Sequence, residues 1–324
     1  MRSRTVTSSV QLTELGFGAA QLGNLNRATT DEASTAAVDV AWDAGVRYFD
    51  TAPHYGLGLS ERRLGAALRD RPRESYVVST KVGRLLEPTP EHAGEQDGHG
   101  FHVPATHRRV WDFSRDGILR SLEQSLERLG LDRVDVVYLH DPDDHLQQAA
   151  TEGVDALVRL RDEGVVGAIG AGMNQSAALA ELVRRCDLDV VMLAGRYTLL
   201  DQGALDDLLP LALDRGVGVV AAGVYNSGLL SRADVPDDAS FDYLPASAEL
   251  VARARALAAR CAAHGVTLPD AAVQLPLRHP AVVSVVLGTR TAEQVREGAR
   301  RASAPIPDAL WAELEASGEL RGVA

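Results

Sequence analysis

The chain has 324 residues, of which 45% are hydrophobic and 24% are charged, the composition of a globular protein with a sizeable core. Its formal net charge of -12 argues against nucleic acid or an anionic membrane surface as a partner, because both repel a negative protein. With two cysteines, no apolar N-terminal segment and no run long enough to cross a bilayer, we expect a cytoplasmic enzyme with a small-molecule substrate. The sequence does not indicate an oligomeric state.

The N-terminal part of the chain predicts a small hairpin, then a strand and a helix. Polar and apolar residues alternate over residues 1–14, as in a hairpin, and residues 15–20 form an apolar strand. The glycines up to Gly23 do not have the spacing of a dinucleotide-binding fingerprint. Thr29 and Glu32 have the spacing of a capping box and predict the start of the first helix.

Three of the apolar runs that follow end in an ionisable side chain. The first ends in Asp50, with Tyr55 on the loop beyond it, and the next two end in Lys81 and His140. The carboxyl ends of parallel barrel strands meet at one edge, where active sites lie. Taken singly, such residues are often turn, solvated or structural residues. Four of them at one edge indicate an acid–base cluster.

Helices and strands alternate to the end of the chain. About eight short strands rich in β-branched residues, the fifth at residues 165–170, are separated by amphipathic helices, the last of which starts near Thr291. The strands are apolar throughout, which implies burial on both faces. This rhythm predicts an α/β fold, a (β/α)8 TIM barrel with an N-terminal β-hairpin; a doubly wound open sheet is the alternative. No linker divides residues 1–324, which we expect to form a single domain.

Residues 83–112 interrupt this alternation. A loop of this length is usually a lid, a substrate-binding loop or disordered. Its histidines lack the tight spacing of a metal site, and the run from His140 to Asp144 would need divergent backbone directions to enclose an ion, so we expect no metal. His54 and Trp111 are predicted to line the substrate pocket.

The predicted cluster has a clear chemical use. A tyrosine has a reference pKa of about 10 and exchanges protons poorly near neutrality. An ammonium from Lys81 would favour the phenolate of Tyr55, and Asp50 would hold that lysine charged and in place. His140 could orient a substrate oxygen. Such a site suits proton transfer at a carbonyl or hydroxyl oxygen while a hydride moves at the attached carbon.

The segments that hold these residues resemble the aldo-keto reductase family, and the resemblance runs nearly end to end. It is carried by residues 45–52 with Tyr55, residues 79–81 and residues 135–140. The resemblance implies a barrel that binds NAD(P) in extended form without a Rossmann fold. It assigns Tyr55 as the general acid/base, Lys81 and Asp50 as the residues that tune it, and His140 as the substrate orienter.

Further segments are similar to one branch of that family, the aldose 1-dehydrogenases (L-fucose or D-threo-aldose), together with pyridoxal 4-dehydrogenases. They are residues 111–114, 172–175 and 225–230. The function that this implies is hydride transfer between a nicotinamide and a sugar or similar small hydroxy or carbonyl compound. A pyridoxal dehydrogenase and a general aldehyde/ketone reductase are the alternatives within the class.

The resemblance also implies the cofactor contacts. Residues 172–174, after the fifth strand, correspond to the nicotinamide carboxamide site, residues 227–229 to a loop over the pyrophosphate, and residues 288–290 to the adenosine phosphate, where a helix N-terminus suits an anion. The predicted contacts are Gly18, Ala19, Asp50, Gly172, Met173, Asn174, Tyr225, Asn226, Ser227, Gly228, Leu229, Gly288, Thr289, Arg290 and Gln294.

Some positions depart from the family pattern. Ala194 stands where a glutamine is usual, and Ala222 and Gly223 stand where a tyrosine would stack on the nicotinamide, which leaves Tyr225 as a candidate for that role. NADP-preferring members often have an arginine where Gln294 stands, although Arg290 could contact a 2′-phosphate. The choice between NAD and NADP therefore stays open.

Two other classes of protein are alternatives to an oxidoreductase. A cofactor-binding regulatory subunit is known in this superfamily, but the presence of all four cluster residues argues against that role. A metal-dependent barrel hydrolase would need several carboxylate and histidine ligands at strand ends, where only Asp50 and His140 occur.

Overall fold

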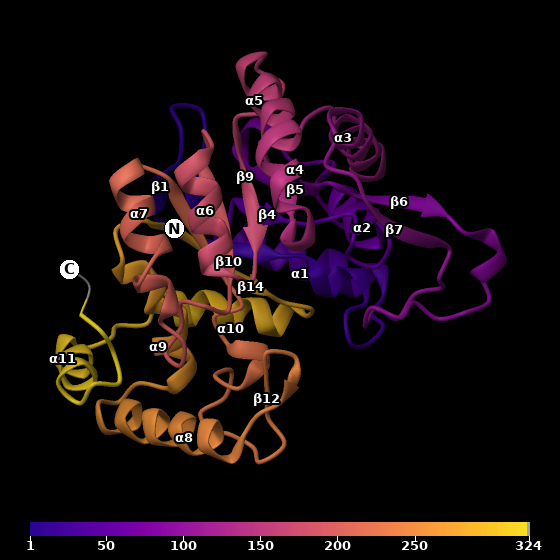
Figure 1. Cartoon of the computed structure of the whole chain (residues 1–324). Coiled ribbons are helices and arrows are strands. Elements are labelled where there is room, and N and C mark those ends of the chain that lie inside the picture. Colours follow the sequence, from indigo (N-terminus) through magenta and orange to yellow (C-terminus); the bar gives the residue numbers. More distant parts are fainter. Residues whose placement is uncertain (323–324) are drawn as a thin grey trace.

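The structure is a computed structural model that describes residues 1–322, and a closed barrel of parallel strands forms its centre (Figure 1). The strands follow one another around the barrel in chain order: β3 (Leu15–Gly18), β4 (Tyr48–Asp50), β5 (Val77–Val82), β8 (Val136–His140), β9 (Ala168–Met173), β10 (Val190–Ala194), β11 (Gly218–Ala222) and β14 (Val282–Gly288). Pairing of β14 with β3 closes the barrel. The predicted (β/α)8 barrel is confirmed, and the open sheet is excluded.

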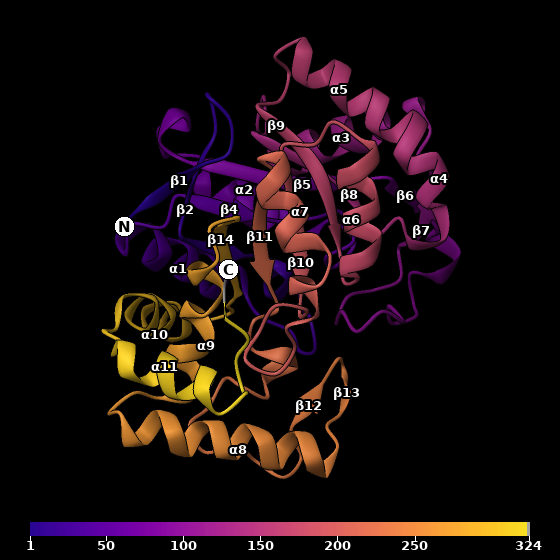
Figure 2. The ribbon, with the colours of Figure 1, turned by 60° about the vertical axis from the view of Figure 1, so that its left-hand side comes forward.

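Helices cover the outside of the barrel (Figures 1 and 2). They are α1 (Asp31–Asp43), α2 (Leu59–Leu68), α3 (Arg115–Leu129), the short α4 (Leu146–Gln148) leading into α5 (Val154–Asp162), α6 (Ser176–Arg185), α7 (Leu208–Arg215) and α10 (Ala292–Ser303). A second group, α8 (Ala248–Ala263), α9 (Leu268–Gln274) and α11 (Asp308–Ala316), packs around a buried cluster of its own. The helix predicted near Thr291 is α10, and it is not the last, because α11 follows it.

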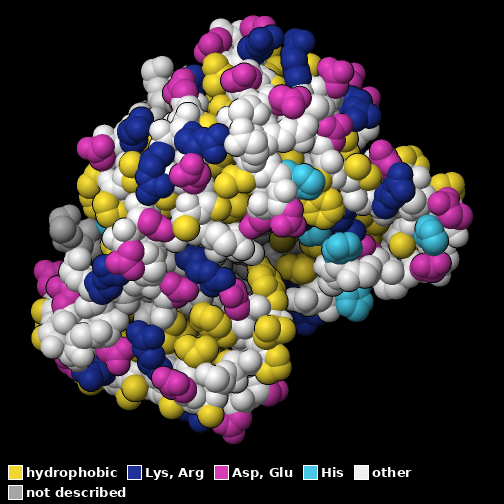
Figure 3. Space-filling view, in the orientation of Figure 1, with side chains coloured by type: hydrophobic (Ala, Val, Ile, Leu, Met, Phe, Trp, Pro, Cys, Tyr) yellow, Lys and Arg dark blue, Asp and Glu magenta, His cyan; other side chains and the backbone are white. Residues whose placement is uncertain are grey.

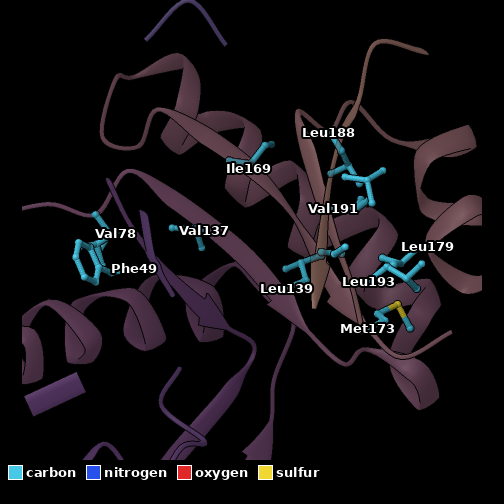
Figure 4. Packing of buried hydrophobic residues seen from close by; sticks show 14 of the residues in the cluster. Phe49, Val78, Val137, Leu139, Ile169, Met173, Leu179, Leu188, Val191 and Leu193 are labelled. Carbon is cyan, nitrogen blue, oxygen red and sulfur yellow. The ribbon is translucent and has the colours of Figure 1, made fainter. Parts of the chain in front are cut away.

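The alternation of side chains along each strand divides the core into two layers. Outward side chains pack beneath the helices; Figure 4 shows Leu139, Ile169 and Leu193 in this layer, with Leu179 of α6 beside Leu193. Inward side chains fill the barrel, and the predicted N-terminal hairpin, β1 (Ser3–Thr5) with β2 (Gln11–Thr13), adds apolar residues to this inner layer. Because Cβ direction repeats every two residues, the same alternation sets which strand-end residues face the barrel axis.

Two boundaries differ from prediction. The N-cap of α1 is Thr30, whose Oγ1 accepts a hydrogen bond from the Ala33 amide at 3.2 Å, so the capping box predicted at Thr29 and Glu32 was wrong. The strand β9 continues to Met173, whereas its end was expected at residue 170. Gly172 and Met173 therefore lie within the strand and not after it.

The segment 83–112 is an ordered insertion and not an irregular loop. It contains an antiparallel hairpin of β6 (Arg84–Pro88) and β7 (His107–Trp111), which extends from the barrel at the right of Figure 1. Its distal part returns to the barrel, where Phe101 pairs with Leu25 in an isolated bridge. Phe101 and Leu25 also pack against Tyr55 in a small apolar cluster. The insertion thus contacts the loop that carries the predicted acid/base.

The loop that carries Tyr55 is held by a close backbone contact. Gly23, at the end of the 3₁₀ helix Ala20–Gly23, lies against the Tyr55–Gly56 peptide; a Cβ on Gly23 would stand 2.6 Å from the carbonyl carbon and oxygen of Tyr55. Gly56 has a φ of +63°. Glycine at both positions lets the two loops touch, which fixes the height of Tyr55 above the barrel.

We expect Gly23→Ala to lower the free energy of unfolding by about 1–3 kcal/mol, because the neighbouring atoms belong to the backbone and cannot rotate away. Urea denaturation measures the change. Gly98→Ala is the matched control, since a Cβ at Gly98 would meet no atom within 4 Å. Equal stability of the two variants would contradict the proposed contact.

Candidate active site

A buried ion pair joins two of the predicted residues at the carboxyl ends of β4 and β5. Lys81 Nζ lies 2.7 and 2.9 Å from the two carboxylate oxygens of Asp50 and donates a further hydrogen bond to the Thr51 carbonyl at 3.0 Å. The Ser79 hydroxyl donates to Asp50 at 2.7 Å. Both charged side chains are at most 4% exposed. Every polar contact that a buried lysine can make is therefore directed and satisfied.

Tyr55 and His140 lie beside this pair. The Lys81 ammonium stands 4.8 Å from the centre of the Tyr55 ring, and the Tyr55 and His140 ring centres are 5.9 Å apart. The structure thus brings together all four residues predicted to form the cluster. It does so because Asp50, Lys81 and His140 all point inward at neighbouring strand ends, and the short loop after β4 returns Tyr55 over them.

The charge states of this cluster follow from its burial. Burial raises the pKa of Tyr55 to about 12, although the Lys81 charge acts in the opposite direction. Burial is the largest single effect on Lys81 and acts to lower its pKa, but the charges and hydrogen bonds of Asp50 and Tyr55 together outweigh it, so that this pKa is raised and the lysine stays charged. The expectation that Lys81 would make the phenol acidic is correct for its own contribution, but burial is the larger effect. In the free protein Tyr55 is therefore a protonated phenol.

His140 is neutral for the same physical reason. Burial, with the nearby charges of Arg84 and Lys81, holds its pKa well below the usual value of 6.5. Its Nδ1 atom is buried and has no hydrogen-bond partner among residues 1–322. A neutral imidazole in this position can donate or accept one hydrogen bond, as a substrate oxygen requires.

A polar cavity of about 300 Å³ opens next to the cluster. Arg84 is one of its lining residues; it donates to the Asp141 carboxylate at 3.0 Å, and its guanidinium carbon lies 4.8 Å from the centre of the Trp111 ring. The cavity is lined by Arg84, Trp111, Asp141, Asp143, Asp144, His145, Asn174 and Gln175. The structure therefore places the predicted substrate residue Trp111 and the predicted cofactor residue Asn174 around one opening.

The other predicted substrate residue, His54, is half-buried between the cluster and the insertion. Its ring centre lies 5.6 Å from that of His140 and 5.8 Å from that of His99. In the space-filling view, histidine side chains gather between the middle of this face and the β6–β7 hairpin (Figure 3). Burial and the charges of Arg84 and Arg109 lower the pKa of His54 to about 2, so it too is neutral.

The predicted cofactor residues on the first and fifth strands lie at the same rim. Gly18 pairs with Asp50, and the Ala19 amide donates to the Asp50 carbonyl at 2.9 Å. Gly172 faces the barrel interior, where a Cβ would stand 3.8 Å from Cε of Lys81. Met173 faces outward, and its side chain packs beside Leu179 and Leu193 (Figure 4). Only the backbone of Met173 is therefore available to a ligand at the carboxyl rim of the barrel.

The predicted pyrophosphate loop already makes several internal contacts. Asn226 and Ser227 both have positive φ, and the Ser227 hydroxyl accepts from the amide of Tyr243, in the small hairpin of β12 (Ser240–Phe241) and β13 (Leu244–Pro245). Gly228 ends the 3₁₀ turn that starts at Asn226, and Leu229 is fully buried. The hydroxyl of Tyr225 accepts from Arg301 of α10 at 3.1 Å.

The predicted adenosine-phosphate segment follows β14. Arg290 is 7% exposed and donates to the backbone carbonyls of Leu25 and Arg27, so its guanidinium is directed away from solvent. The side chain of Gln294 accepts from the amides of Arg290 and Thr291 in a capping box of α10. The expectation that Arg290 is available for a 2′-phosphate is therefore not supported by this geometry.

Unpartnered polar atoms indicate that the rim fits a polar ligand. Asn226 Oδ1, Thr289 Oγ1 and Gln21 Oε1 are all buried without a hydrogen-bond partner within the described part of the chain. Buried polar atoms are usually hydrogen-bonded, and these three occur in or beside the predicted cofactor segments. Gly288 lies directly against Gln21, since a Cβ there would stand 2.6 Å from its amide nitrogen. A nicotinamide dinucleotide has amide and hydroxyl groups that can donate to the two amide oxygens, and phosphate oxygens that can accept from the Thr289 hydroxyl.

Among residues 1–322, no group of three or more His, Cys, Asp or Glu side chains is placed to hold a metal ion. Within the same residues, no helix is long and apolar enough to span a membrane.

Active sites of parallel (β/α)8 barrels lie at the carboxyl rim, and the structure places a tyrosine, a lysine, an aspartate and a histidine there. The chain belongs to the aldo/keto reductase family, whose profile matches residues 14–319.

The relatives of the chain agree with this assignment. It is 50% identical over 303 residues to D-threo-aldose 1-dehydrogenase of a Pseudomonas species, covering 93% of this chain and 92% of that protein. It is 40% identical over 330 residues to pyridoxal 4-dehydrogenase of Microbacterium luteolum, covering 96% and 95%. The holo form of aldo-keto reductase AKR11C1 from Bacillus halodurans superposes with a TM-score of 0.76 at 26% identity, covering 100% and 98%.

Sequence reasoning missed the two arginines of the insertion that reach the site, Arg84 and Arg109. Arg84 lies two positions beyond the end of β5 and could have been found from its place next to a strand end. Arg109 is close to His54 only because β7 folds back along β6, and no sequence spacing indicates that contact.

We expect Lys81→Met and Asp50→Asn each to lower the free energy of unfolding, and the Lys81→Met variant by about 3–5 kcal/mol, because it leaves a buried carboxylate without its partner. The double variant should lose much less free energy of unfolding than the sum of the losses in the two single variants. A double-mutant cycle by urea denaturation measures this coupling. Additive losses would mean that the two charges do not depend on each other.

Proposed function

We propose that the enzyme is an aldose 1-dehydrogenase that oxidises a sugar at its anomeric carbon with NAD. The Asp50–Lys81 pair beside Tyr55 and His140 is the observation that supports this proposal most directly, because it provides a proton acceptor for a hydroxyl group. The likeness to D-threo-aldose 1-dehydrogenase at 50% identity supports the substrate class. The likeness to pyridoxal 4-dehydrogenase makes pyridoxal the second candidate substrate.

In this proposal each of the four residues has one task. Neutral His140 hydrogen-bonds the anomeric hydroxyl and orients it toward Tyr55. The Tyr55 oxygen, deprotonated with the help of the adjacent Lys81 charge, removes the hydroxyl proton. Asp50 keeps the lysine charged and immobile. As the C–H bond at the anomeric carbon breaks, a C=O bond forms and the sugar becomes a lactone. A bound nicotinamide supplies the hydride acceptor.

The contacts after β14 support NAD as the cofactor in this proposal. Arg290 is engaged with two backbone carbonyls, and Gln294 is engaged in the capping box, so neither side chain offers a charge to a 2′-phosphate. We further propose a cytoplasmic location, supported by the two free thiols of Cys186 and Cys261, which suit a reducing compartment. The proposed partner is a small molecule, with neither nucleic acid nor membrane.

A nicotinamide absorbance screen over aldoses, pyridoxal and simple aldehydes, with NAD and NADP in parallel, tests the proposal. We expect turnover of an aldose with a lower KM for NAD than for NADP.

Tyr55→Phe should reduce kcat by roughly two to four orders of magnitude, because it removes the proton acceptor while leaving the cofactor contacts in place. Retained turnover in Tyr55→Phe would remove this residue from the proposed role, and exclusive turnover of pyridoxal or simple aldehydes would overturn the substrate class. Activity should also persist in EDTA.

The pH dependence of the reaction should show the titration of Tyr55. Since burial raises its pKa to about 12, the phenolate fraction grows with pH, and oxidative kcat/KM should rise by up to about tenfold per unit above neutrality. The buried neutral histidines should add no step near 6.5, because the pKa values of His140 and His54 are both lowered. Steady-state rates in constant ionic strength buffers measure the profile. A step near 6.5 that His140→Gln abolishes would show that this histidine titrates in the working range.

A further inference from the structure

One buried side chain of the insertion 83–112 binds His54 directly. Arg109 of β7 donates from Nη1 and Nη2 to the two carboxylate oxygens of Asp97 at 2.6 and 3.0 Å. Both side chains are at most 4% exposed. The same guanidinium donates from Nε to His54 Nδ1 at 2.6 Å and from Nη2 to the His54 carbonyl at 3.1 Å. One arginine therefore binds the ring and the backbone of the residue that precedes Tyr55.

This contact decides which nitrogen of His54 carries the proton. An arginine guanidinium has five N–H donors and no acceptor, and it does not lose its charge in proteins. His54 Nδ1 must therefore accept, and in the neutral ring the proton must lie on Nε2. A second proton on Nδ1 would oppose the Arg109 charge directly. The groups around the ring, Arg84, Arg109, His99 and Lys81, all act to keep it neutral.

The Nε2–H is on the edge of the ring that does not face Arg109. His54 is half-buried, with its ring centre 6.1 Å from that of Tyr55 and 5.6 Å from that of His140. Phe101 of the insertion packs edge-on at 5.2 Å and prevents the ring from tilting away. The ring that carries this N–H thus lies beside both residues proposed to hold the reacting oxygen.

We propose that the insertion is part of the active site: through Arg109, held by Asp97, it fixes His54 as an Nε2–H donor that binds a hydroxyl oxygen on the carbon next to the reacting carbon. The substrate class is accordingly the α-hydroxy carbonyl compounds and their hemiacetals, which deepens, and rests on, the proposed aldose dehydrogenase function. Arg109 and Asp97 are positioning residues, because they act only through His54.

Two substitutions of His54 separate a donor role from a purely structural one. The amide of glutamine extends as far from the backbone as Nε2 and can donate there, whereas the amide of asparagine extends only as far as Nδ1 and can accept from Arg109. We expect His54→Gln to keep the KM for an aldose within about threefold, and His54→Asn to raise it about tenfold with little change in kcat. The reverse order, with asparagine retained and glutamine impaired, would show that His54 only anchors the insertion.

The hydroxyl itself is tested with a pair of substrates. The tenfold effect of His54→Asn should appear with an aldose and disappear with its 2-deoxy analogue, which lacks the oxygen that Nε2–H would bind. An equal increase in KM for both sugars in His54→Asn would overturn the assignment of this hydroxyl. His92 provides the control, since it is an exposed histidine of the insertion 83–112. His92→Gln and His92→Asn should leave the KM for both sugars unchanged.

The tautomer can be measured without any substrate, so this inference and the proposed function can fail separately. In long-range ¹⁵N–¹H NMR spectra, with the His54 signals identified by their loss in His54→Gln, wild-type His54 should be a neutral Nε2–H ring down to about pH 5. Arg109→Met, which keeps the aliphatic volume, should yield a mixture of tautomers. An Nδ1–H ring, or protonation near neutrality in the wild type, would overturn the inference even if aldoses are oxidised. A correct tautomer without aldose turnover would instead reject the proposed function alone.

Discussion

The site depends on a lysine that stays charged although it is almost completely buried. Burial alone would drive Lys81 towards its neutral form, and the Asp50 carboxylate at 2.7 Å, together with Tyr55, reverses that tendency. The geometry must be accurate, because a buried pair that loses alignment costs more in desolvation than it gains in attraction. A barrel strand suits this demand: Asp50 and Ser79 are paired residues of adjacent strands, and Lys81 follows Ser79 by two positions, so all three face one point.

Much of this arrangement could be predicted, because it depends on local patterns. Apolar runs that end in Asp50, Lys81 and His140 indicate strands, and the alternation of side chains places those three residues on the inner face. The regular alternation of strands and helices along the chain predicts the barrel itself. Strand ends were less certain: β9 extends through Gly170, Ala171 and Gly172, and small residues of this kind do not distinguish a strand from the turn after it.

The features that could not be predicted depend on contacts between distant segments or on burial. Arg109 meets His54 across 55 positions, and Arg290 meets Leu25 across 265. No rule of sequence spacing predicts a contact between residues that are so far apart in the chain. The protonation of Tyr55 was misjudged for a related reason, since the sequence names the charged neighbours but not the depth of the phenol. A charge can be assigned from the residue type, whereas desolvation requires the packed structure.

The charges around the site are matched in pairs. Lys81 faces Asp50, Arg84 faces Asp141, and Arg109 faces Asp97, each with a nitrogen–oxygen distance of 3.0 Å or less. Because each of these cations has its own carboxylate, none of the three presents unbalanced charge to a carboxylate or phosphate on the substrate. The two histidines between them are neutral, and neutral imidazoles bind hydroxyl groups well. This balance favours an uncharged polyhydroxyl substrate.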